Sequence, residues 1–482
     1  MPGFGAMRPM LIGVMLAYLA VIAAVAVWAS RRTSTTSDYF AAGRRLGLWT
    51  LSISSMAATL SGFAFIGGPG LVYRLGMGAV WIVLPVTITG TLSAWVLAEP
   101  LRRYAETHGA VTIPGVLRAR YQSPVVQGVA AVAIALAVIA YTATNTLALG
   151  LVLEAVLGLD RAPALWLGAG ITLAYSVAGG ILAGVYADMV QGAVMAVASV
   201  LICWWVWAAG ERVGGFGAAI GAADASWFTP FGTMSPFAAM SLFFVFGLGT
   251  LGQPHVLHKF LMVRDRAVLR WFPLVSNAAM LVSLLLFVAV GVAMRGLVAA
   301  GAEAPLSRPD DATPIFLLHH TPRLVAGLVF AATAAAIMST VNSFLSVGAA
   351  ALSRDLPEAL GRPAPDTLTT ARLWTIGIAV VAAIVAAASE AVVGFLGIFG
   401  WGLFAAALVP ALALGLNWPQ ATARAAAASM LTGVLVTLAV ESASWFKQVA
   451  LPPGVTGTAL ALVASLCVFI GVTFTSPAST HA

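Results

Sequence analysis

Long apolar runs recur along almost the whole chain, and they restrict its fold more than any other feature. Reading each run as a helix of about 20 residues, the length that crosses a bilayer core, gives about 13 spans. The chain is 61% hydrophobic and 9% charged, which excludes a soluble domain of 482 residues. We therefore expect an all-α integral membrane protein. The predicted spans are 10–30, 47–73, 78–98, 124–154, 162–180, 184–209, 236–256, 271–297, 323–352, 370–388, 391–416, 422–441 and 456–476.

The net charge of +7 comes from basic residues scattered singly or in pairs between the apolar runs, so nucleic-acid binding is not expected. Alternating the spans across a bilayer places about two thirds of the Lys and Arg residues, Lys259 among them, on one side. The positive-inside rule makes that side cytoplasmic. We expect a multi-pass protein of the plasma or inner membrane, functional as a monomer, with its N-terminus outside and its C-terminus in the cytoplasm.

A dense polar cluster interrupts the apolar run 323–352, formed by Ser339, Thr340, Asn342 and Ser343. At 100° per residue these four side chains share one face of a helix. Hydrocarbon cannot satisfy such a face, so it must border a protein cavity or an ion. Each hydroxyl could instead bond a carbonyl one turn earlier. The density of the cluster favours a hard monovalent cation such as sodium.

Two other apolar runs are interrupted, at Met56–Gly70 and at Phe246–His255. Pro removes a backbone donor and Gly weakens a helix, so both segments can open and expose carbonyl oxygens. Because the interruptions begin two groups of five spans, 47–209 and 236–416, we expect two inverted repeats with a site between them. The rest of this single transmembrane domain, 1–482, is an extra N-terminal helix and two extra C-terminal helices, 10–30 and 422–476.

Asp188 follows a glycine-rich stretch near the cytoplasmic end of a span. It could cap a helix N-terminus, or attract a cation that leaves the polar cluster inward. His255 and His258, the candidate cluster for an enzyme, flank the cytoplasmic end of a span beside Lys259. We expect both at the membrane interface, so enzymatic activity is not expected.

In order and spacing these segments resemble the sodium:solute symporter family, within the group that shares the LeuT-type inverted-repeat fold. The resemblance runs from about Ser37 to Arg424. Its landmarks are Asp38–Arg44, Ser61-Gly62, Gly68–Gly70, Thr112–Pro114, Asp188 with Gln191, Gly252–His255, Met338–Thr340 and Ala351–Leu356.

The resemblance implies sodium-coupled import of a small organic solute by alternating access, with Na⁺ as the coupling ion. It implies a sodium site formed by the carbonyls of Ala57, Leu60 and Ala336 and the hydroxyls of Ser339 and Thr340. Some members bind a second sodium at positions that match Asp188, Ser339, Asn342 and Ser343. Here Asn342 stands where a serine is expected.

Positions that contact substrate in various members match Thr59, Ser61, Phe246, Thr250 and Pro254. Members that carry proline typically have Asp at position 59, Trp at 246 and Tyr at 250, which argues against a close proline-carrier match. A sugar carrier is not favoured either, because the pocket helices lack a dense polar set. A small monocarboxylate or amino acid is expected. A proline or sugar-type member and a transporter-like membrane sensor remain the alternatives.

Overall fold

The computed structural model describes residues 4–30, 46–363, 368–389, 393–445, 451 and 455–476. Within them the chain is built from helices and forms no β-strand. The landmark Asp38–Arg44 lies outside the described residues. The α-helices are α1 (Phe4–Ser30), α3 (Leu48–Thr59), α4 (Gly68–Leu75), α5 (Val80–Val86), α6 (Thr89–Ser93), α7 (Glu99–His108), α8 (Ile113–Tyr121), α9 (Pro124–Leu157), α10 (Arg161–Arg212), α11 (Phe216–Ala223), α12 (Pro236–Gly249), α13 (Pro254–Leu257), α14 (Arg266–Ala299), α15 (Ala312–His320), α16 (Arg323–Ala350), α17 (Leu356–Ala359), α18 (Leu368–Ala388), α19 (Val393–Val409), α20 (Ala423–Trp445) and α21 (Gly457–Thr475). Short 3-10 or π segments join them: η2 (Phe63–Gly67), η3 (Gly76–Ala79), η4 (Ala94–Ala98), η5 (Ala225–Phe228), η6 (Thr250–Gly252), η7 (His258–Met262), η8 (Pro309–Asp311), η9 (Ala351–Asp355) and η10 (Pro410–Leu414).

These helices confirm a multi-pass membrane protein, although the number of spans differs from the expectation. Among the described residues ten helical segments are long and apolar enough to cross a membrane, or eleven if the bent pair Pro236–Gly252 and Pro254–Met262 is one span. Two segments are very long: Phe63–His108 has 46 residues and α10 has 52. At about 1.5 Å per residue each would extend to more than twice the thickness of a bilayer core, so each is long enough for two crossings. The count of 13 stays a prediction.

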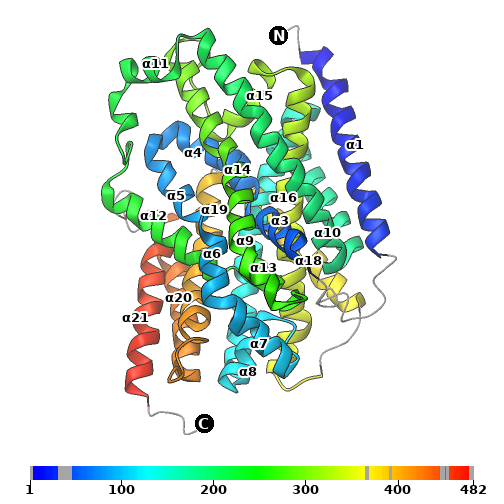
Figure 1. Cartoon of the computed structure of the whole chain (residues 1–482), viewed down its shortest axis with the longest axis vertical. Coiled ribbons are helices and arrows are strands. Elements are labelled where there is room, and N and C mark those ends of the chain that lie inside the picture. Colours follow the sequence, from blue (N-terminus) through cyan, green and yellow to red (C-terminus); the bar gives the residue numbers. More distant parts are fainter. Residues whose placement is uncertain are drawn as a thin grey trace.

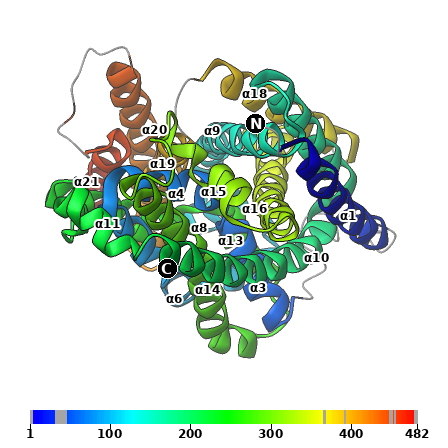
Figure 2. The ribbon, with the colours of Figure 1, turned by 90° about the horizontal axis from the view of Figure 1, so that it is seen from above.

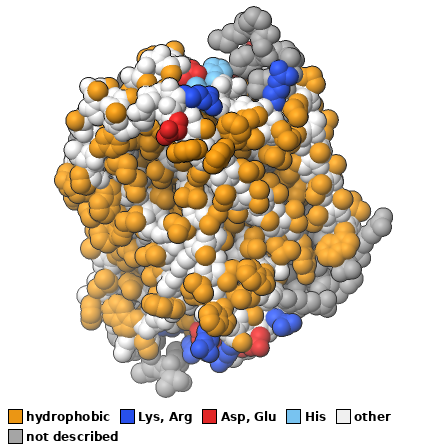
Figure 3. All heavy atoms as spheres, turned by 45° about the horizontal axis from the view of Figure 1, so that its top comes forward, with side chains coloured by type: hydrophobic (Ala, Val, Ile, Leu, Met, Phe, Trp, Pro, Cys, Tyr) orange, Lys and Arg blue, Asp and Glu red, His pale blue; other side chains and the backbone are white. Residues whose placement is uncertain are grey.

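The helices form a bundle with an apolar waist. On the face shown in Figure 3, a broad hydrophobic band separates the charged side chains at its two ends. Figures 1 and 2 place α1 at one edge of the bundle and α21 at the opposite edge. α16 and α19 lie inside, since 83% and 89% of their spans are buried, against 22% for α1. The polar face of α16 must therefore find its partners within the protein.

The first broken helix opens at Leu60, where the backbone is extended (ψ 115°) between α3 and η2. The Gly/Pro cluster further along stays helical, at the end of η2 and the start of α4. Its glycines serve close packing instead. A Cβ on Gly67 would lie 2.7 Å from the backbone nitrogen of Gly394, and one on Gly70 would lie 2.7 Å from the carbonyl oxygen of Pro309. This arm is packed against neighbouring backbone and is no hinge.

The second broken helix opens where α12 ends at Gly249. A 3-10 turn follows, and Gln253 is extended (ψ 95°) before α13 begins at Pro254. The two arms are bent by 42°. Both breaks thus lie within the predicted segments. The division into two five-helix repeats, 47–209 and 236–416, stays a prediction.

Main-chain hydrogen bonds join the start of the first broken helix to the end of the second. Leu46 N donates to Met262 O at 3.1 Å, and Arg264 N donates to Leu46 O at 3.2 Å. Together they form an isolated parallel bridge between Leu46 and Val263. The two broken helices are therefore fastened to each other at this end.

Candidate functional site

The polar face of α16 lies against the break in the first broken helix. Ser339 Oγ donates to Ala57 O at 2.8 Å, and it also bonds Ala336 O on its own helix at 3.0 Å. Thr340 Oγ1 lies 3.2 Å from Leu60 O. Both hydroxyl side chains are fully buried. The single hydroxyl proton of Ser339 thus has two acceptors within reach, the local carbonyl that is typical for a helical serine and a carbonyl of the opened backbone.

The five oxygens that the resemblance assigns to a cation lie together here, and a sixth joins them. Thr340 Oγ1 is also 3.2 Å from Ala58 O. A helix that unwinds frees several consecutive main-chain oxygens. The residue types in the sequence therefore do not indicate that the carbonyl of Ala58 would join the cluster. A hydroxyl can point its proton at a carbonyl or turn its lone pairs toward a cation. Neutral oxygens gathered at membrane depth can therefore hold a desolvated monovalent cation.

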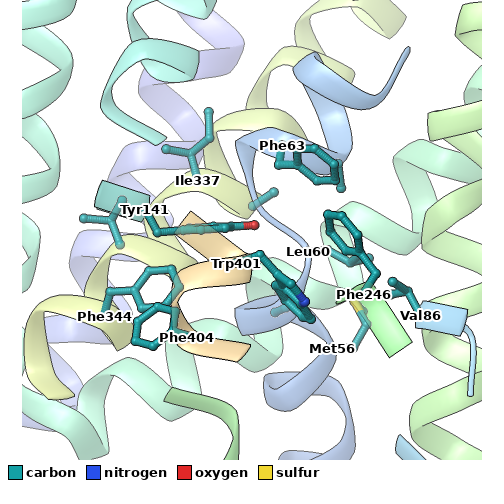
Figure 4. Close-up of a cluster of buried hydrophobic side chains, with 14 of the residues drawn as sticks. Met56, Leu60, Phe63, Val86, Tyr141, Phe246, Ile337, Phe344, Trp401 and Phe404 are labelled. Carbon is teal, nitrogen blue, oxygen red and sulfur yellow. The ribbon is translucent and has the colours of Figure 1, made fainter. Parts of the chain in front are cut away.

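A small cavity with a volume of about 20 Å³ lies beside this contact, between the two broken helices. Phe63, Phe246 and Trp401 stack along it, with 5.5 Å between successive ring centroids. Tyr141 points its hydroxyl toward these rings (Figure 4) and lies 3.1 Å from Ser61 Oγ. The cavity holds little more than one water. The cavity must therefore widen to admit an organic solute.

Two of the five predicted substrate residues, Thr59 and Phe246, line this cavity. Ser61 reaches it through its contact with the tyrosine hydroxyl. Thr250 and Pro254 are buried but do not line it. The chain leaves the α-helix between Phe246 and these two positions, so they do not keep the face that helical spacing predicts.

Sequence reasoning missed Trp401, whose ring stacks on Phe246 and whose Nε1 donates to Val245 O at 3.2 Å. A Cβ on Gly249 would lie 2.5 Å from that nitrogen, so the glycine makes room for the indole. The usable signal was a large aromatic flanked by glycines in a buried helix. This signal does not by itself indicate that the tryptophan stacks on Phe246.

A second cavity of about 20 Å³ lies one helical turn along α16 from Ser339, and Asp188 is part of its wall. The Lys259 ammonium lies 3.0 Å from Asp188 Oδ2, with both side chains buried. Ser343 Oγ lies 3.4 Å from the same carboxylate oxygen. Of the residues assigned to a second sodium, Asp188, Asn342 and Ser343 line this cavity, whereas Ser339 belongs to the first cluster.

One sequence interpretation is wrong at this cavity, and the burial of three other side chains was not predicted. Asp188 caps no helix, because α10 runs through it. His255 and His258, expected at the membrane interface, are 3% and 4% exposed and line the cavity. Lys259, expected on the cytoplasmic side, is buried, and its side of the membrane stays a prediction. The end of the second broken helix turns into the bundle, where the carboxylate supplies a countercharge. Nowhere in the described residues do three or more His, Cys, Asp or Glu side chains gather as for a metal ion.

Residues 298–322, here called the cap, cover the second arm of the first broken helix, which runs through η2 and α4. Its helix α15 lies at the top of Figure 1. Thr313 Oγ1 donates to Phe65 O at 2.8 Å, and Asp310 Oδ2 accepts from Val393 N at 2.8 Å. Burial is the largest cause that raises the pKa of the Asp310 carboxyl to about 6. The cap is thus closed over α4 and pinned to α19 by a buried carboxylate.

Comparison with known proteins identifies the family of this chain. Residues 39–433 match the model of the sodium:solute symporter family. The chain is 29% identical to the high-affinity proline transporter PutP of Bacillus subtilis, over 86% of this chain and 88% of that protein. It is 28% identical to the sodium/proline symporter of Haemophilus influenzae, over 91% and 90% respectively. Its fold is similar to that of a Na⁺-coupled sialic acid symporter in a substrate-bound outward-open state, with a TM-score of 0.78, 19% identity, and 98% of this chain and 99% of that one covered. The chain therefore belongs to the sodium:solute symporter family, and it is a sodium-coupled membrane transporter of a small organic solute, not an enzyme.

Proposed function

We propose that sodium binds at the oxygens that join α16 to the first break. The observation that carries this proposal is the set of contacts from Ser339 and Thr340 to the opened backbone. When the ion binds, both hydroxyls turn their lone pairs inward, and the carbonyls of Ala57, Leu60 and Ala336 complete the shell. The ion replaces weak cross-helix hydrogen bonds by charge–dipole contacts, so it ties α3 to α16.

This tie couples the ion to the transport cycle. Sodium holds α3 against α16 and favours the outward-open state. Solute bound beside Thr59 and Phe246 then permits closure. Inward rocking separates the two helices, and sodium leaves past Asp188. At about −100 mV one inward charge is worth roughly 2.3 kcal/mol, so the voltage alone supports about 40-fold accumulation of a neutral solute.

The solute that the lining of the widened cavity would suit best is a small monocarboxylate or amino acid with a compact apolar body. Phe246 and Trp401 offer ring faces to that body. Ser61 and Tyr141 offer hydroxyls to the polar end. The start of η2 adds a favourable helix dipole for a carboxylate. The Gly62 amide already bonds a side-chain oxygen of α9, at 2.9 Å, so a carboxylate approaches mainly through the hydroxyls.

Proline is the second candidate, because the relatives named above are proline transporters. Its ring is compact enough for the aromatic wall. Thr59, Phe246 and Thr250 nevertheless occupy the positions where the resemblance implies Asp, Trp and Tyr in proline carriers. We therefore place proline inside the amino-acid class and behind less specific members of it.

We also infer that the N-terminus lies outside and the C-terminus in the cytoplasm. The excess of Lys and Arg on one side supports this orientation. The start of α1 and the end of α21 lie at opposite ends of the molecule (Figure 1). A single chain contains both the cation cluster and the solute cavity, which supports function as a monomer.

Uptake into proteoliposomes tests the proposal. The purified protein is given labelled acetate, lactate, pyruvate, alanine, proline or glucose, with an inward gradient of sodium or of potassium. We expect saturable uptake of at least one acid or amino acid that requires sodium, and no uptake of glucose. Uptake that is equal in sodium and potassium would refute sodium coupling, and flux that does not saturate would indicate a channel.

A further inference from the structure

Lys259 places a positive charge where the resemblance suggests a second sodium ion. Its Nζ lies 3.0 Å from Asp188 Oδ2, and it also donates to the Ser54 carbonyl on α3. The side chains of Lys259 and Asp188 are 4% and 1% exposed. The ammonium therefore joins three elements, η7, α10 and α3, inside the protein.

The surrounding cavity is already built for a cation. Asp188, Asn342 and Ser343 line it, and Ser343 Oγ lies 3.4 Å from Asp188 Oδ2. Within the described structure, Asp188 Oδ1 and Asn342 Oδ1 are buried without a hydrogen-bond partner. Gly184 leaves space for the amide, since a Cβ there would lie 2.2 Å from Asn342 Nδ2. These oxygens are the ones that would hold a second sodium.

A sodium ion here would have to share one carboxylate with the ammonium. Two positive charges held a few ångströms apart repel strongly in a medium of low dielectric constant. A buried carboxylate that is already paired gains little from a second cation, and the cavity has little room for one. The ammonium has the advantage that it is covalently attached and needs no dehydration in each cycle.

We propose that the Lys259 ammonium is a tethered replacement for the second sodium, so that this transporter binds one sodium ion, at the Ser339 and Thr340 cluster. The inference rests on the function proposed above. Lys259 acts as a positioning residue: it neutralises Asp188 and holds α10 against α3, and it touches neither the transported ion nor the solute.

Counting bound sodium tests the proposal without any solute. Equilibrium binding of ²²Na⁺ to the purified protein is measured for the wild type, Lys259→Met, Lys259→Arg, and the double variant Lys259→Met with Asp188→Asn. We expect one ion per chain in the wild type and in Lys259→Arg. Lys259→Met frees the carboxylate and doubles the count to two. The double variant, which removes both charges, returns to one.

Several outcomes would overturn the proposal, and they differ from failure of the proposed function. Two ions in the wild type, or one ion in a folded Lys259→Met, refutes the tethered cation while leaving sodium binding intact. If Lys259→Met does not fold, the neutral double variant decides: it must elute as a folded protein and bind one ion, and any other result refutes the proposal. No bound sodium in the wild type would instead refute the proposed function itself.

Discussion

Replacing Thr340 by valine tests the cation site with little change in shape. Valine keeps the volume but lacks the hydroxyl that lies 3.2 Å from both Ala58 O and Leu60 O. A contact between a polar group and a charge contributes about 1.5–3 kcal/mol, so the affinity for sodium should fall about 10- to 150-fold. Two buried carbonyls also lose a partner, so we expect a lower midpoint of thermal unfolding.

Thr333→Val is the matched control. Thr333 is on the same helix and equally buried, but in the described structure its hydroxyl donates within that helix, to Val329 O at 2.9 Å. The assay is the sodium dependence of solute uptake in proteoliposomes, together with ²²Na⁺ binding to the purified protein. Thr333→Val should leave the sodium half-saturation within about threefold of the wild type, because its hydroxyl makes only a local bond. If Thr340→Val has the same sodium half-saturation as Thr333→Val, the assignment of this hydroxyl to the ion is wrong.

Three further substitutions test the cap, the solute cavity and the packing of the second arm of the first broken helix. Because burial raises the pKa of the Asp310 carboxyl from 3.8 to about 6, its ionisation reduces stability progressively as the pH rises from about 4 to 6. Asp310→Asn should therefore increase the free energy of unfolding at pH 7, by at most about 3 kcal/mol, and leave it nearly unchanged at pH 4. The midpoint of thermal unfolding should accordingly rise at pH 7 only, and an equal rise at both pH values would contradict this reasoning. Tyr141→Phe removes a hydroxyl from the cavity and should raise the solute half-saturation about fivefold, while the sodium half-saturation in the same uptake assay stays unchanged. Gly67→Ala places a Cβ 2.7 Å from facing backbone and should cost about 1–3 kcal/mol, whereas Gly170→Ala meets no atom within 4 Å. Equal unfolding midpoints for these two glycine variants would show that the second arm is not tightly packed.

The buried polar cluster on α16 could be predicted from the sequence because its signal is local. A run of hydroxyl and amide side chains in an apolar helix violates the rule for lipid-facing residues, so it needs an internal partner. Ser339 and Thr340 do contact the first break. The position of that break was harder to predict, because glycine both weakens helices and allows close packing. Gly67 and Gly70 serve packing, and the helix opens at Leu60.

The buried ion pair of Lys259 and Asp188 could not be predicted, because these two residues are 71 positions apart in the chain. Hydropathy treats a lysine beside two histidines as a surface group. Nothing near Lys259 in sequence indicates that Asp188 will neutralise it. The aromatic wall has the same character: Phe246 and Trp401 meet through the packing of α12 on α19, which only the tertiary structure reveals. Local patterns thus predicted the polar cluster on α16 and the two broken helices. The ion pair and the aromatic wall depend on long-range packing.

The pair of amide–carbonyl bonds that links Leu46 with Met262 and Arg264 uses no side-chain atom. Most substitutions at this joint therefore leave both bonds intact, and the exceptions are proline at position 46 or at position 264, because each of these residues donates one of the two N–H groups. We therefore expect these joined ends of the two broken helices to move together. In the proposed mechanism the moving boundary would lie between these joined ends and α16, where a bound ion would hold the two sides together until its release.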